Sequence, residues 1–157
     1  MAQEFPESGL VRRTFIVREM DLPPNVLMTK RSLLRWFALA SGMISEKESR
    51  STVLDVIDSL LYFQFSKKKN PTTLEIQSYI KEKTRKAISE KLIRYHLRRL
   101  IDQNILLRKQ KKYYFNPAPN AEPFDLKQSF NFWVKEHINK SFINLETVIE
   151  KLSDSYK

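Results

Sequence analysis

The 157-residue chain contains no cysteine and only two histidines, His96 and His137. Without cysteine it can form no disulfide, thiolate nucleophile, zinc finger or iron–sulfur centre, and two histidines are too few for a histidine-rich metal site. Its two glycines cannot supply a glycine-rich phosphate loop or a dinucleotide-binding fingerprint. There is no nucleophile elbow, and no carboxylate pair outside a solvated helical pattern. We therefore predict a protein that is not an enzyme and has no cofactor or metal site.

Long apolar runs and a secretory signal are also missing. The N-terminus is acidic, with no apolar core after a basic start. The longest apolar stretch, from Leu33 to Ile44, is interrupted by Arg35 and is far shorter than the roughly 20 residues that cross a bilayer. We expect a soluble, cytoplasmic protein with no membrane partner.

Positive charge is concentrated in one third of the chain. Residues 67–112 contain fifteen lysines and arginines and four acids, a net charge of +11, so the other residues carry −1 of the total of +10. A concentrated positive field suits a face that binds a polyanion, since releasing counterions from phosphates favours binding. The alternative is an incidental lysine-rich surface.

Capping residues and apolar spacing predict two helices before residue 67. The first begins after Thr29 as N-cap and ends at Gly42. The second opens with a capping box of Ser45 and Glu48 and ends in a solvated, lysine-rich run. Alternating apolar residues in 11–20 favour a short strand ahead of these helices.

A third helix opens with a second capping box, Thr72 and Glu75, and polar residues 83–86 provide a turn after it. Its apolar side chains are available to a core: Leu74, Ile76, Tyr79 and Ile80.

Ser89 caps a fourth helix, which ends near Gln103, and Asn104 suits a left-handed C-terminal cap. Two β-prone runs, 105–108 and 113–115, flank a basic polar tip and predict a hairpin. The inner face of the fourth helix consists of Ile93, Leu97, Leu100 and Ile101.

Prolines at 117, 119 and 123 predict an extended linker after the hairpin. Residues 125–153 then contain no glycine or proline and predict one long helix with an apolar stripe. A stripe of this length needs something to be buried against. The helix could fold back on its own domain, but the proline-rich linker favours reaching outward, and we expect a second copy of the chain. The predicted dimer interface consists of Phe130, Val134, Ile138, Phe142, Leu145, Ile149 and Leu152.

The order helix, helix, helix, hairpin within residues 49–116 resembles that of winged helix-turn-helix transcriptional regulators, in the broad sense that covers the ArsR- and MarR-type families. The closest match is residues 89–106. It departs from the family pattern at Asn104, where glycine is typical, and the same backbone conformation tolerates asparagine. The matching positions are Ser89, Ile93, the pair His96-Leu97, Leu100 and Asn104-Ile105.

The predicted fold class is accordingly mainly α with a small β-hairpin, a winged helix-turn-helix with an N-terminal extension and a long C-terminal helix. The predicted domains are an N-terminal extension with one helix (1–44), the winged helix-turn-helix (45–117) and the dimerisation helix (124–155). The resemblance implies a sequence-specific regulator that binds double-stranded DNA as a homodimer. The alternative is a winged-helix scaffold or architectural subunit of a transcription or replication assembly, with protein or non-specific DNA contacts.

The fourth helix supplies the candidate base-reading residues. Arginine can grip guanine bidentately, so Arg94 and Arg98 are the best candidates for base contacts, while Lys91 and Tyr95 would serve bases or phosphates. The alternative is a solvated basic helix face.

The predicted wing and turn supply candidate phosphate contacts. Lys109, Lys111 and Lys112 would lie along a phosphate strand or the minor groove, or else form a charged turn that resists edge aggregation. Arg85 and Lys86 would touch the DNA backbone or form a solvated turn. Residues 113–115 could stack on RNA bases, but alternating strand residues that pack the wing onto the helices explain them better.

Overall fold

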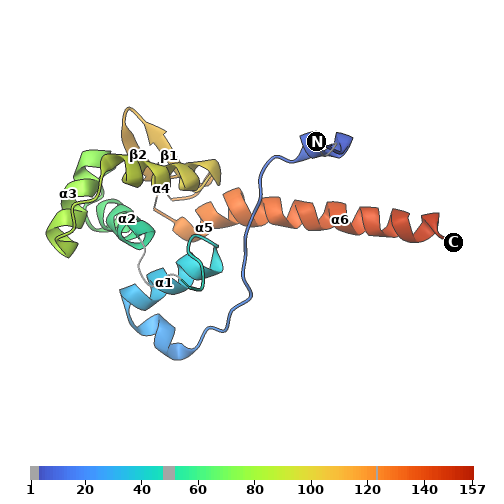
Figure 1. Ribbon diagram of the computed structural model, residues 1–157, viewed down its shortest axis with the longest axis horizontal. Helices are drawn as coiled ribbons and strands as arrows, with labels where there is room; N and C mark the ends of the chain where they lie inside the picture. Colours follow the sequence, from blue (N-terminus) through green and yellow to red (C-terminus); the bar gives the residue numbers. More distant parts are fainter. Residues whose placement is uncertain (1–3, 48–51, 123) are drawn as a thin grey trace. The chain divides into compact units, whose positions relative to one another are not determined.

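The computed structural model describes residues 4–47, 52–122 and 124–157. The fold is mainly helical with a small two-stranded antiparallel sheet, as the sequence predicts (Figure 1). It divides into two compact units, Met1–Leu54 and Asp55–Lys157. This division falls inside α2 (Thr52–Leu61), whereas the sequence favours a boundary between residues 44 and 45. The predicted domain ranges stay predictions.

The first unit contains two 3₁₀ helices, η1 (Pro6–Leu10) and η2 (Pro24–Met28), and the helix α1 (Lys30–Ala40). The predicted caps of α1 are confirmed. The Thr29 hydroxyl accepts a hydrogen bond from the backbone N–H of Ser32 at 3.1 Å, and Gly42 has a left-handed φ of 74° just after the helix. A Cβ atom at Gly42 would lie 2.5 Å from Ile16 Cγ2, so the position also requires glycine for space.

The predicted strand at 11–20 is wrong, because the segment is extended but has no neighbouring strand among the described residues. A main-chain hydrogen bond from Arg18 N to Ala40 O, 2.8 Å long, joins the segment to the end of α1. The Arg18 guanidinium also donates to the carbonyls of Leu39 (2.8 Å) and Ile44 (2.7 Å). The segment thus caps the C-terminal end of α1. In the predicted capping box Ser45–Glu48, Glu48 lies outside the described residues.

In the second unit, α2 continues into the π-helical turn η3 (Tyr62–Ser66) and is followed by α3 (Thr73–Thr84), α4 (Glu90–Asp102), β1 (Leu106–Lys109) and β2 (Lys112–Phe115). The helices and the hairpin share one apolar core, because each buries a row of aliphatic side chains. That core consists of Val56, Ile57, Leu60, Ile76, Ile80, Ile93, Leu97, Leu100, Leu106 and Tyr113.

The capping box of α3 is confirmed. The Thr72 hydroxyl accepts from Glu75 N at 3.2 Å, and Glu75 Oε1 accepts from Thr72 N at 3.1 Å. The helix runs to Thr84, so the turn begins at Arg85, two residues later than predicted. The prediction that Leu74 is a core residue is wrong. Leu74 is 60% exposed, because the buried face of α3 is formed by Ile76 and Ile80, which are four residues apart.

The hairpin is confirmed, with a tighter tip than predicted. Lys109 pairs with Lys112, so only Gln110 and Lys111 form the turn, and their φ values of 52° and 64° are those of a two-residue type I′ turn. The segment before α3 lies beside β2, since Tyr113 N donates to Pro71 O at 2.9 Å and Thr72 forms a bridge with Lys112.

The long C-terminal helix is also confirmed. It is capped by Asp125 and runs through α5 (Leu126–Phe130), the π-helical turn η4 (Asn131–Lys135) and α6 (Glu136–Ser155). The preceding linker does not simply extend outward as predicted. Its carbonyls accept hydrogen bonds from the helix, Asn116 O from the Ser129 hydroxyl and Pro117 O from Trp133 Nε1 (3.1 Å).

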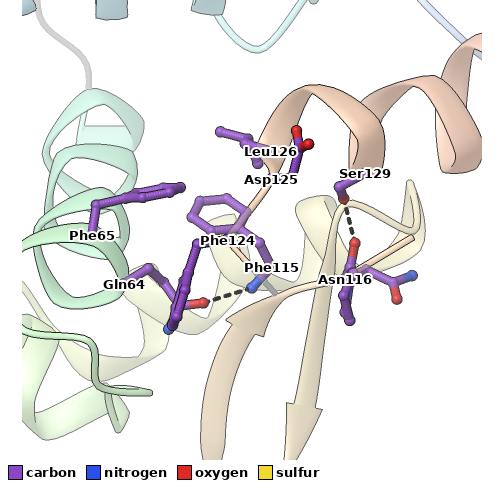
Figure 2. A pocket seen from close by; sticks show the side chains of 9 residues that line it. Gln64, Phe65, Phe115, Asn116, Phe124, Asp125, Leu126 and Ser129 are labelled. Atoms are coloured by element: carbon purple, nitrogen blue, oxygen red, sulfur yellow. Dashed lines mark hydrogen bonds between the residues drawn. The ribbon is translucent and has the colours of Figure 1, made fainter. Parts of the chain in front are cut away.

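Figure 2 shows this junction, where aromatic side chains from η3, the end of β2 and the segment just before the C-terminal helix gather. The buried Gln64 joins them, because its carbonyl oxygen accepts from Phe115 N (3.2 Å) while its amide donates to Asn70 Oδ1 (2.7 Å). The hydrogen bonds and the packing together anchor the first turns of the C-terminal helix to the hairpin.

Candidate functional site

The helix α4 has one buried face and one exposed face. Ile93 and Leu97 are fully buried, Leu100 is 3% exposed, and all three pack into the core. The four predicted recognition residues lie on the other side and are all exposed: Lys91, Arg94, Tyr95 and Arg98. The inward and outward assignments made from the apolar spacing are therefore confirmed as positions. Their role in binding stays a prediction.

Local hydrogen bonds fix where α4 begins. The Ser89 hydroxyl accepts from Leu92 N at 3.2 Å, which confirms the predicted cap. Arg85 ends α3 in the left-handed conformation, with a φ of 61°. The Gln77 amide then donates across the turn to Ile88 O at 2.7 Å. Sequence reasoning missed Gln77, because a glutamine on a helix surface gives no pattern that identifies its partner.

Both candidate base-reading arginines make surface ion pairs along α4. Arg94 Nη1 lies 3.6 Å from Glu90 Oε1, and Arg98 Nε lies 3.1 Å from Asp102 Oδ1. The side chains of Arg98 and Asp102 are 75% and 62% exposed. Exposed pairs of this kind contribute about 1 kcal/mol at most. The guanidinium groups can therefore exchange these carboxylates for a stronger external acceptor at little cost.

Helical geometry divides the exposed face of α4 into two rows. One row is cationic and contains Lys91, Arg94 and Arg98. The other contains Leu92, which is 40% exposed, and Tyr95, which is 58% exposed. Arg99 continues this second row, with its guanidinium carbon 5.9 Å from the centre of the Tyr95 ring. Sequence reasoning missed Leu92, although its position outside the buried apolar spacing was a usable signal.

The basic residues of the turn and the hairpin are exposed as well. Arg85 and Lys86 lie in the turn before α4, and three lysines lie at or beside the hairpin tip: Lys109, Lys111 and Lys112. Tyr113 is only 2% exposed, and the next two residues of β2 are half-buried. The packing of these aromatic residues agrees with the interpretation that they join the hairpin to the helices, rather than forming an open stacking surface.

Other basic side chains of residues 67–112 are engaged within the fold. Lys83 Nζ lies 2.7 Å from Asp58 Oδ2, and this hydrogen bond raises the pKa of Lys83. Lys69 pairs with Glu75, and its hydrogen bond is the main cause that lowers the pKa of that carboxyl group. Lys83 thus joins α3 to α2, and Lys69 joins the segment before α3 to the first turn of that helix.

A second exposed surface lies on α6, which has no buried residue of its own. From Asn139 onward every residue is exposed. Of the predicted interface, Val134 is 6% exposed and packs within its own chain, and Ile138 is half-buried. The remainder is open to solvent: Phe130 (43% exposed), Phe142 (57%), Leu145 (56%), Ile149 (61%) and Leu152 (52%).

The part of the chain that the structure describes offers no metal cluster of three or more His, Cys, Asp or Glu side chains. The cavity in Figure 2 has a volume of about 10 Å³, room for about one water molecule. Among the helices of residues 4–47, 52–122 and 124–157, none has the length and apolar character required to cross a membrane.

No family model, no curated protein and no solved structure matches the chain.

Proposed function

We propose that this chain is a winged helix-turn-helix regulator that binds double-stranded DNA sequence-specifically as a homodimer. The observation that carries the proposal is the division of α4 into a fully packed inner face and an exposed cationic outer face. A helix fits the major groove of B-DNA, where arginine can bind guanine O6 and N7 together. In this proposal Arg94 and Arg98 read bases, and Lys91 and Tyr95 contact bases or phosphates.

The neighbouring elements support the same assignment. In a winged helix-turn-helix, α3 would precede the recognition helix α4, and the β1–β2 hairpin would be the wing. The segment that contains Pro71 and Thr72, which lies beside β2, would add a short third strand to that wing. The turn and wing cations, among them Arg85, Lys86 and Lys111, would then contact phosphates. A basic surface of this kind gains affinity from counterion release.

The exposed stripe of α6 supports the dimer. Phe142, Leu145, Ile149 and Leu152 are each more than half exposed, and each large apolar side chain gains about 1.5–3 kcal/mol when it is buried. Their spacing of three, four and three residues is that of a helix pair. A two-fold pairing would also present two recognition helices to successive major grooves, so the preferred site would be palindromic.

The experiment that tests the function is selection of bound duplexes from a random pool, followed by salt titrations of binding to a selected duplex and to a random one. A regulator should keep a large difference in affinity between them at physiological salt, typically about 10³-fold or more. Equal affinities would contradict the proposal and favour the architectural or scaffold function. Failure to bind either duplex would remove DNA as the partner.

A charge-matched pair of variants then tests the wing. Replacing Lys109, Lys111 and Lys112 with glutamine should weaken binding to both duplexes by similar factors. The plot of log K against log salt should become less steep, by about one unit of slope for each lysine that no longer neutralises a phosphate. The control neutralises three exposed lysines of the C-terminal helix, Lys127, Lys140 and Lys151, and should leave the slope nearly unchanged. An unchanged slope in the wing variant would show that the hairpin faces away from DNA.

A further inference from the structure

The second row of α4 contains two exposed side chains that the core does not use. Leu92 lies in the first turn of the helix and is 40% exposed, and Tyr95 lies one turn later and is 58% exposed. The core contacts of α4 are already made by Ile93, Leu97 and Leu100. An apolar side chain among exposed cations does nothing for phosphate binding, so this row calls for a separate chemical explanation.

Leu92 can offer a partner only its apolar side chain. The amide groups of the first helical turn commonly bind phosphate, but the Leu92 N–H already donates to the Ser89 hydroxyl at 3.2 Å. The Tyr95 ring is also held in place, since His96 contacts it edge-on with ring centres 5.3 Å apart and the Arg99 guanidinium lies 5.9 Å from its centre. Leu92 and the ring of Tyr95 therefore present apolar surface beside the cationic row.

In the major groove of B-DNA, thymine alone presents an apolar group, its 5-methyl, while guanine presents two acceptors suited to arginine. An apolar row beside an arginine row therefore complements thymine next to guanine. We propose that α4 recognises thymine through its 5-methyl group, which packs against Leu92 and the ring of Tyr95. This inference rests on the proposed function and specifies part of the sequence that the protein would bind.

The test uses the full chain and a selected duplex in which each thymine is replaced, one at a time, by deoxyuridine. This replacement removes only the methyl group and leaves base pairing and charge unchanged. We expect one or two positions per half-site to lose affinity about 3- to 5-fold, the size of effect expected for one buried methyl group. The other positions should show no change.

Variants then assign the effect to the two side chains. In Leu92→Ala combined with Tyr95→Ala, binding to the thymine duplex should weaken, and the sensitive positions should no longer distinguish thymine from uracil. Tyr95→Phe keeps the ring and should keep the distinction. The matched control is Leu33→Ala, because Leu33 of α1 is 43% exposed, close to the value for Leu92. This control should retain the full uracil effect.

The outcomes separate the two proposals. Sequence-specific binding with no uracil-sensitive position, or a uracil effect that persists in the double variant, would overturn the methyl contact and leave the regulator proposal standing. Equal binding to selected and random duplexes, or no binding, would overturn both. Because Leu92 and Tyr95 are exposed, the variants should unfold at the Tm of the parent chain, which a thermal melt checks.

Discussion

The helices α4 and α6 have similar apolar periodicities and opposite surroundings. In α4 the apolar row Ile93, Leu97 and Leu100 is buried and the cations are exposed. In α6 the apolar row is exposed from Phe142 onward, and no residue of the helix is buried. Periodicity thus identifies an apolar face in both helices, but only packing decides whether the chain itself covers it.

The difference arises where the core of the second unit ends. Ser129 and Val134 are the last buried residues of the C-terminal helix, and every residue from Asn139 to the end of the helix is exposed. Helical stability in proteins comes mostly from packing of an apolar face. The two helices therefore differ in what stabilises them. Packing within the chain stabilises α4, and we infer that a partner stabilises α6.

The largest expected effect comes from charging the α6 stripe. In a two-fold dimer, Leu145→Asp removes two buried leucine side chains at once, a loss of about 3–6 kcal/mol before any cost of burying carboxylates. Light scattering should report a dimer for the parent chain and a monomer for this variant, with greatly weakened DNA binding. Phe142→Asp should behave in the same way.

The matched control for this charge is Asn144→Asp, which adds a carboxylate next to Leu145 but outside the stripe. It should remain dimeric. A parent chain that is monomeric at micromolar concentration would remove the dimer model and leave the assignment of α4 untouched.

Substitution by alanine should distinguish what stabilises α4 from what stabilises α6. Leu97→Ala in α4 creates a cavity in a closed core and should lower the free energy of unfolding by about 2–5 kcal/mol, whatever the protein concentration. Leu145→Ala should lower it only through dimerisation, so its effect should fade as the chain is diluted. Denaturant unfolding at several protein concentrations measures both. An effect of Leu145→Ala that is independent of concentration would show that α6 is covered by its own chain.

Substitutions on the exposed face of α4 should affect binding rather than folding. Arg94→Ala or Arg98→Ala should cost about 1–3 kcal/mol on a selected duplex and much less on random DNA, because a bidentate base contact is specific for sequence. Arg35→Ala, which removes an exposed arginine of α1, is the control and should bind like the parent. Equal losses on both duplexes would make Arg94 and Arg98 phosphate contacts.

Local signals predicted most of the fold. The caps at Thr29, Thr72 and Ser89 are made by side chains within three residues of their partners, so the sequence alone identifies them. The strand expected at 11–20 failed because a strand requires a neighbour, which no local pattern provides. The contacts of Gln64 and Gln77 were missed for the same reason, since their partners lie on other elements.

The candidate site was predictable to a similar degree. The exposed positions of Arg94 and Arg98 follow from the buried spacing of α4, and the exposure of Leu92 follows from that spacing as well. The linker was misjudged because its prolines indicate an extended chain but not the surface that it lies on. Asn116 is buried and accepts from Ser129, so the linker holds the C-terminal helix in place.

The smallest expected effect concerns α3, which positions the turn before α4. The pKa of Glu75 is held below its ordinary value of 4.5, chiefly by its hydrogen bond with Lys69, with Thr72 adding to the effect and burial opposing it. A carboxylate with a depressed pKa stabilises the folded state above its unfolded pKa, and that contribution is lost as the pH falls through the folded pKa. Glu75→Gln keeps an acceptor but loses the charge, so it should lower the free energy of unfolding at pH 7 by about 1 kcal/mol or less.

The difference in the free energy of unfolding between this variant and the parent should shrink steadily below about pH 4.5. Denaturant unfolding at pH 7 and at pH 3.5 measures this, with Glu82→Gln, which neutralises an exposed carboxylate of the same helix, as the control. A difference that stays constant over this range would mean that the capping geometry, and not the charge of Glu75, supports α3.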